Sequence, residues 1–228
     1  MDLIRFETLI DFSEESRVAT PAESVFKALT GKDSLPRGKP REPGVRIRNE
    51  KERRAIVWHY DSCSILFEDM PDHNYCIDST IKSLEKINVV APLHRLKSRS
   101  LIIFWILPTP KYDFKSLEAK YRESFIKRSP IFDNCIDIDA SVIIDMKYDN
   151  CILHHQSGAM DIAQLQREYR AFGTKEGCPK LFIFLETTIR NPEVVEYSRE
   201  NMEEYLHRSF EKGKAHSIDF QKIMEGIL

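Results

Sequence analysis

A predicted β-hairpin contains the side chains that are best suited to chemistry. In the stretch CIDIDASVIIDM (135–146) polar and apolar residues alternate, so Asp137, Asp139 and Asp145 share one face of the predicted strand. The next residues, KYDN (147–150), are typical of a tight turn, after which CILHHQS folds back as an antiparallel strand. The sequence therefore predicts a hairpin with a row of acidic side chains on one face.

This hairpin places His154 opposite Asp145 and His155 opposite Ile144. An Asp–His pair with a second acid nearby offers ligand types that Mg²⁺, Mn²⁺ and Zn²⁺ accept. One hypothesis is therefore a metal-dependent enzyme built on the 137–155 hairpin, with the catalytic candidates Asp139, Asp145, His154 and His155. The alternative is the solvated outer face of a sheet, where the Asp145–His154 pair contributes about 1 kcal/mol or less. We favour the alternative, which predicts no metal site and no cofactor.

A second group of candidates is basic and lies in residues 37–54. These side chains crowd a predicted loop and hairpin, and Trp58 and Tyr60 follow on the next strand. Clustered cations and exposed rings are what phosphate contact and base stacking require, so one hypothesis is a nucleic-acid-binding protein. The candidate interaction or nucleic-acid-binding residues are Arg37, Lys39, Arg41, Arg46, Arg48, Arg53 and Arg54.

The distribution of charge favours a protein partner over nucleic acid. The chain has a net charge of −2, but residues 32–128 sum to +7 and residues 129–228 to −6. Glu42, Glu50 and Glu52 interrupt the basic segment, and they oppose a polyanion more than they oppose a mixed-charge surface. We therefore expect a protein partner or self-association. On another copy, the docking surface would be the acidic helix around Glu200, Glu203 and Glu204.

The periodicity of the chain predicts an α+β fold. The sheet is expected to be mixed or antiparallel, with helices packed mainly on one face, in a single domain over 1–228. The element order also suggests two related βαβ-type halves, 1–128 and 129–228. Strands are predicted at 3–10, in three runs over 45–69, and as buried central strands at 99–108 and 181–189; helices are predicted at 73–90, at 114–128 and from Ser198, with a break at Gly213. Residues 161–172 suit either a helix or a strand, and 31–44 are expected to form a mobile loop.

The cysteines and the hydropathy indicate where the protein works. Five cysteines are widely spaced without a CxxC pair, which is typical of buried, reduced thiols in a cytosolic protein. The N-terminal residues lack the pattern of a secretory leader, and the longest apolar run, LIIFWILP (101–108), is too short to cross a bilayer. We therefore expect a cytoplasmic protein with no membrane contact.

Three stretches carry a resemblance to a known family. They are the Arg-containing central strand HRLKSRSLIIFWILP, the strand LFIFLETTI, and the helix EYLHRSFEKGKAHSI with its Leu206-His207 and Ser217-Ile218 steps. In these the chain resembles a sporadically distributed prokaryotic family of uncharacterised single-domain α+β proteins. Lys214 stands where that family has an aromatic residue. The resemblance implies the fold and a place in a defence-type system, but it supplies no catalytic residues.

The sequence as a whole predicts a non-enzymatic accessory or protein-interaction module. None of its motifs has the spacing that a specific catalytic site requires. Nucleic-acid binding through 37–54 and metal-dependent catalysis through 137–155 are the two alternatives.

Overall fold

The computed structural model describes residues 1–13, 22–32, 44–70, 72–125, 141–148 and 150–228. The predicted loop at 31–44 lies almost entirely outside these residues. The elements are β1 (Asp2–Phe12), α1 (Ala22–Thr30), β2 (Gly44–Asn49), β3 (Arg54–His59), β4 (Ser62–Glu68), α2 (His73–Val90), β5 (Arg95–Pro108), α3 (Phe114–Phe125), β6 (Ser141–Tyr148), β7 (Cys151–Asp161), α4 (Ile162–Glu168), β8 (Leu181–Asn191), β9 (Val195–Glu196) and α5 (Arg199–Ile227).

The strands form one sheet in the order β2-β3-β4-β1-β5-β8-β7-β6, and β9 pairs with β5 off this path. Every pair of neighbouring strands in the described residues is antiparallel. The α+β fold expected from the periodicity is confirmed. Strand β5 pairs with β8 from Arg99 to Pro108, so the ranges 1–128 and 129–228 share one sheet.

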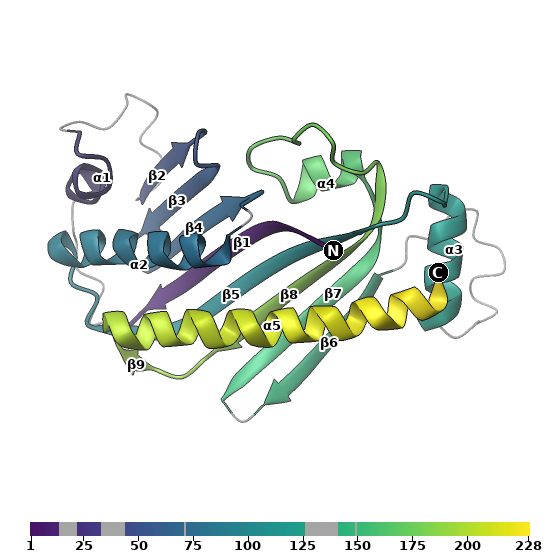
Figure 1. Ribbon diagram of the computed structural model, residues 1–228. Coiled ribbons are helices and arrows are strands. Elements are labelled where there is room, and N and C mark those ends of the chain that lie inside the picture. The colour runs from purple at the N-terminus through teal and green to yellow at the C-terminus, as the bar shows by residue number, and fades with distance from the viewer. Residues whose placement is uncertain (14–21, 33–43, 71, 126–140, 149) are drawn as a thin grey trace.

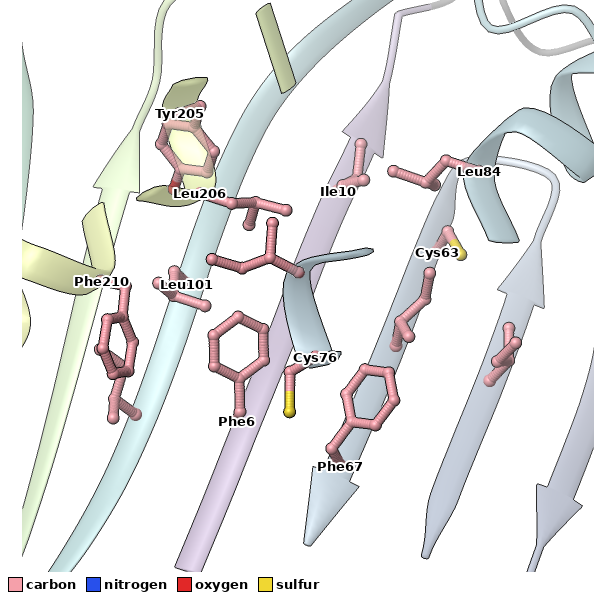
Figure 2. Packing of buried hydrophobic residues seen from close by; sticks show 14 of the residues in the cluster. Phe6, Ile10, Cys63, Phe67, Cys76, Leu84, Leu101, Tyr205, Leu206 and Phe210 are labelled. Carbon is pink, nitrogen blue, oxygen red and sulfur yellow. The ribbon is translucent and has the colours of Figure 1, made fainter. Parts of the chain in front are cut away.

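The helices α2 and α5 cover one face of this sheet, which is called the α5 face below (Figure 1). Figure 2 shows Phe6 and Leu101 of the sheet close to Leu206 and Phe210 of α5. The Phe6 and Phe210 ring centroids are 6.1 Å apart. Burial of each such side chain contributes about 1.5–3 kcal/mol, so this layer is the main source of stability.

The short helix α4 covers part of the opposite face, called the α4 face below. Its Leu165 packs in a second core cluster with Phe104 of β5 and Phe184 of β8. Central strands β5 and β8 are therefore buried on both faces here, as their apolar sequences predict. Asp161 caps α4. Its side chain accepts a hydrogen bond from the backbone N–H of Gln164, and the Gln164 side chain accepts a hydrogen bond from the backbone N–H of Asp161. This capping box makes the start of the ambiguous segment helical.

The C-terminal helix corrects one prediction. It begins at Arg199, near Ser198 as expected, but it does not break at Gly213 and continues to Ile227. A Cβ atom at Gly213 would lie 2.7 Å from Cδ1 of Ile103 and 3.0 Å from Cδ1 of Ile189. The glycine is there because the helix approaches the sheet closely, and helical hydrogen bonds continue through it. No helix among the described residues, α5 included, is both long and apolar enough to cross a membrane.

Four of the five cysteines lie in the described residues, and all four are free thiols. Cys63 of β4 and Cys76 of α2 are both buried in the core between α2 and the sheet, and burial raises the pKa of each thiol to about 12. These two groups are protonated and inert at physiological pH, as expected for structural cysteines.

Candidate functional site

The β6–β7 hairpin has the register that the sequence predicts. His154 pairs with Asp145, and His155 pairs with Ile144. The Nδ1 atom of His154 lies 2.7 Å from Oδ1 of Asp145, and the two side chains are 36% and 70% exposed. At this exposure the pair contributes about 1 kcal/mol or less to stability.

His155 belongs to a buried network on the other side of the sheet. Its Nδ1 lies 2.9 Å from Nε2 of His216 on α5, and its Nε2 lies 2.7 Å from Oγ of Ser157. The Ser157 hydroxyl is in turn 2.7 Å from the hydroxyl of Tyr121 on α3. Burial, together with His216 and His154, lowers the pKa of His155 to about 4, so the ring is neutral at pH 7. The network fastens α3 and α5 to β7.

The hairpin candidates for metal-dependent catalysis are therefore divided. Asp145 and His154 lie on the α4 face, whereas His155 is 2% exposed on the α5 face. Asp137 and Asp139 lie outside the described residues. Within the part of the chain that is described, no group of three or more His, Cys, Asp or Glu side chains is arranged to hold a metal ion.

The basic candidates are divided as well. Arg37, Lys39 and Arg41 lie outside the described residues. Arg46 and Arg48 alternate along β2 onto the α4 face, where Arg46 lines a cavity with Glu7. Arg54 points to the other face and donates a hydrogen bond to Oγ of Ser79 on α2 over 3.4 Å. The sheet itself separates these guanidinium groups, so the described part of the segment does not form one basic surface.

Arg53 has a structural role. Its Nη2 lies 2.8 Å from Oδ2 of Asp69 and donates a hydrogen bond to the Gly173 carbonyl over 2.7 Å. The fully buried Glu68 lies next to it and accepts a hydrogen bond from the Phe172 N–H over 3.1 Å. Arg53 therefore holds the segment after α4 against the sheet. Arg48 lies over the Phe172 ring, with its guanidinium carbon 4.5 Å from the ring centroid.

The acidic helix surface proposed as a docking site is partly neutralised within α5. Arg199 Nε lies 3.7 Å from Oε2 of Glu203, and Arg208 Nη2 lies 2.7 Å from Oε1 of Glu204. Exposed pairs of this kind contribute little to stability, but they reduce the net field that an incoming basic surface would meet.

The edge strand β6 has an exposure that the alternation does not predict. It is the last strand of the sheet, and none of its residues is buried. Ile143, Ile144 and Tyr148 are 58%, 46% and 41% exposed. The sequence carries one sign of this: Ile143 interrupts the alternation by placing an apolar side chain on the face of Asp145. The hairpin therefore presents an apolar edge, and this edge is the candidate site that the described residues best define.

Comparison with known proteins does not assign the chain to a family. No protein-family model matches the chain, and no curated protein matches it either. The function is therefore inferred from the geometry alone.

Proposed function

We propose that the protein is a non-enzymatic interaction module that self-associates by pairing β6 with β6 of a second copy. The observation that carries the proposal is the exposure of β6: a whole edge strand with two isoleucines and a tyrosine open to solvent. Figure 1 shows β6 at the end of the sheet, beside β7.

An exposed edge strand presents unpaired backbone N–H and C=O groups to any strand that approaches it. Proteins that remain monomeric usually protect such edges with short strands, prolines, bulges or many charges. Strand β6 spans Ser141–Tyr148 without a proline, and its described neighbour is β7 alone. Strand addition supplies affinity through the backbone, and the side chains on the two faces decide which partner fits.

The side chains of β6 favour a second copy as the partner. In an antiparallel pair related by a two-fold axis, opposite residues lie on the same face and the axis passes beside one residue. An axis at Met146 places Asp145 of each copy opposite Lys147 of the other, which gives two ion pairs. It also places Ile144 of each copy opposite Tyr148 of the other. An axis at Asp145 would instead oppose two carboxylates, which is unfavourable. Charge complementarity therefore selects the register centred on Met146.

Charge exchange within β6 tests the proposal. The chain mass is 26.7 kDa, and we expect sedimentation equilibrium to report twice that mass at high protein concentration. Asp145→Lys and Lys147→Asp should each weaken the dimer, because each variant places like charges opposite each other. The double exchange Asp145→Lys/Lys147→Asp should restore it. A matched exchange of the exposed pair Asp219 and Lys222 on α5, whose charged atoms are 3.1 Å apart, should leave the mass unchanged.

Two results would overturn the proposal. One is a monomer at every concentration; the other is a dimer that neither single exchange weakens. A dimer lost in all three β6 variants would show that β6 is involved but that the register centred on Met146 is wrong.

A further inference from the structure

A cavity of about 400 Å³ lies where the N-terminal half of α5 crosses β5, β7 and β8. Sites that hold small molecules have volumes of about 300–1,000 Å³, so this cavity is large enough for a small ligand. The basic side chains of Arg99, Arg208 and Lys212 line it, together with one acid, Glu204. That acid is already paired with Arg208 at 2.7 Å, so the charge left in the cavity is positive.

Arg99 is the central group of this cavity and pairs with no acid of the described residues. The residue is 7% exposed, and its guanidinium carbon lies 4.5 Å from the centroid of the Tyr205 ring. Its Nη1 donates a 3.4 Å hydrogen bond to the Asn201 carbonyl, but its buried Nε has no hydrogen-bond partner in the part of the chain that the structure describes. No carboxylate of the described residues lies within 4 Å of it. Burial lowers the pKa of Arg99, an effect that Tyr205 and Glu193 partly oppose.

A buried guanidinium without an acid is costly, because desolvation of the charge is not offset by a partner. The surroundings nevertheless hold Arg99 in one place. The Tyr205 hydroxyl lies 2.9 Å from the Arg99 carbonyl oxygen and 2.8 Å from that of Ile189, so the ring beneath the guanidinium is fixed across two strands. A charged group that is fixed in advance and left unpaired is the arrangement expected of a binding site for an anion.

Lys212 supplies a second unpaired charge. Its Nζ lies 3.2 Å from Sγ of Cys151 and 3.8 Å from the centroid of the Tyr148 ring. Within the described chain it forms no ion pair. The two cations that lack acids, Arg99 and Lys212, therefore line the same cavity.

We propose that this cavity binds a small phosphorylated ligand, whose phosphate group is held by Arg99 and Lys212. A phosphate monoester carries close to two negative charges at neutral pH, which matches the two unpaired cations. The planar fork of the Arg99 guanidinium can bind two phosphate oxygens at once, and the lysine adds a third contact. Asn191 and Asn201 also line the cavity and offer carboxamides to the rest of the ligand. The site adjoins the β6 edge, because Lys212 contacts the Tyr148 ring, but neither of its two cations lies on β6 and the proposal does not rest on self-association.

Titration with inorganic phosphate and pyrophosphate at constant ionic strength tests the proposal. Both anions should raise the thermal midpoint of the unmodified protein, and Arg99→Met should weaken the affinity at least tenfold. Without ligand, Arg99→Met should unfold at the same or a higher temperature, because an apolar side chain replaces an unpaired buried charge. Lys97→Met removes an exposed charge from the same strand and should leave the affinity unchanged.

An Arg99 with a purely structural role would give the opposite pattern. Arg99→Met would then be less stable without ligand, and phosphate would stabilise it as much as the unmodified protein. That pattern, or no stabilisation of the unmodified protein by either anion up to tens of millimolar, overturns the proposal. If Arg99→Met does not fold, Lys212→Met takes its place and should show the same loss of affinity.

Cys151 provides a second measurement that needs no variant. Its thiol lines the cavity beside Lys212, whereas the half-buried Cys178 packs in the second core cluster on the other face of the sheet. Phosphate should slow the alkylation of Cys151 by iodoacetamide and should leave the rate of alkylation at Cys178 unchanged. Peptide mass spectrometry measures both rates. Equal rates at Cys151 with and without phosphate would contradict binding at this site.

Discussion

His154 and His155 are consecutive residues that lie on opposite faces of the sheet, one exposed beside Asp145 and the other buried against His216. The alternation of a β-strand is the whole cause of this difference. It turns a sequence that resembles a metal-binding pair into two side chains with separate roles.

This relationship predicts how stability depends on pH. The pKa of His155 is about 4 in the folded chain, below the 6.5 of an unperturbed histidine. Because the folded pKa is the lower one, the unfolded chain takes up a proton first as the pH falls. The stability that depends on a neutral His155 is fully present above about pH 6.5 and is lost progressively as the pH falls to about 4, by about 3 kcal/mol in total.

Urea unfolding between neutral pH and pH 4.5 measures this loss. His155→Gln cannot take up the proton and should lose the larger part of the pH dependence, although it should be less stable at neutral pH. His154→Gln, which changes the exposed neighbour, should retain the dependence of the unmodified protein. The same slope in both variants would show that His155 is not its source.

Gly213 predicts a difference between two glycines of the same helix. A methyl group at Gly213 meets two buried isoleucine side chains of the sheet, whereas one at Gly226 meets no atom of the described residues within 4 Å. Overpacking of this kind costs about 1–3 kcal/mol. Alanine in place of glycine inside a helix contributes up to about 1 kcal/mol, and less near a helix end.

We therefore expect Gly213→Ala to lower the free energy of unfolding and Gly226→Ala to leave it equal or slightly higher. Chemical denaturation of the two variants under the same conditions measures the difference. If both variants gain stability, α5 does not approach the sheet as closely as the structure places it.

Phe104 predicts the cost of a cavity at the centre of the sheet. It lies on β5 with no exposed surface, between Tyr169 and Phe184, at ring-centroid distances of 4.6 and 5.8 Å. Phe104→Ala should lower the free energy of unfolding by about 3–5 kcal/mol, and Phe104→Asp should prevent soluble expression. Val89→Ala, at a side chain that is 83% exposed, is the matched surface change and should cost less than about 0.5 kcal/mol.

The features that local sequence determines could be predicted. The register that joins Asp145 to His154 follows from alternation and from the turn residues between the strands, which act over a few positions. The starts of the helices predicted at 73–90 and from Ser198 are local in the same way, because in each the side chain just before the helix accepts a hydrogen bond from a backbone N–H of the first turn.

The features that sequence reasoning missed depend on residues far apart in the chain. The Gly213 prediction was wrong because helix propensity is weaker than packing against Ile103, which lies on a different element. The cavity at Arg99 requires β5, β7, β8 and α5 together, and no local pattern contains them. One sign was available: Arg99 lies in the predicted central strand itself, two residues before its apolar run LIIFWILP, and charged residues are rarely buried without a partner.

The last prediction separates Arg53 from the other basic residues with which the sequence groups it. Arg53 pairs with Asp69 and donates hydrogen bonds to the carbonyls of Phe172 and Gly173, whereas Arg46 is exposed and forms no ion pair within the described residues. Arg53→Ala removes the donor to the Phe172 carbonyl and one of the two guanidinium groups at Asp69, where Arg170 remains, and this should cost about 1–3 kcal/mol. It should also increase amide hydrogen exchange in the segment around Phe172, because one of the side chains that fasten this segment is gone.

Arg46→Ala, the matched change on the neighbouring strand, should alter neither stability nor exchange by a measurable amount. The two variants also separate a structural from an interaction role. If residues 44–54 contact a partner electrostatically, Arg46→Ala should reduce that binding in a salt-dependent way while the fold is unchanged. A loss of binding in Arg53→Ala should follow its loss of stability instead. Equal stability of the two variants would show that the contacts of Arg53 do not hold the segment around Phe172. Arg53 would then be a candidate for contact with a partner, like Arg46.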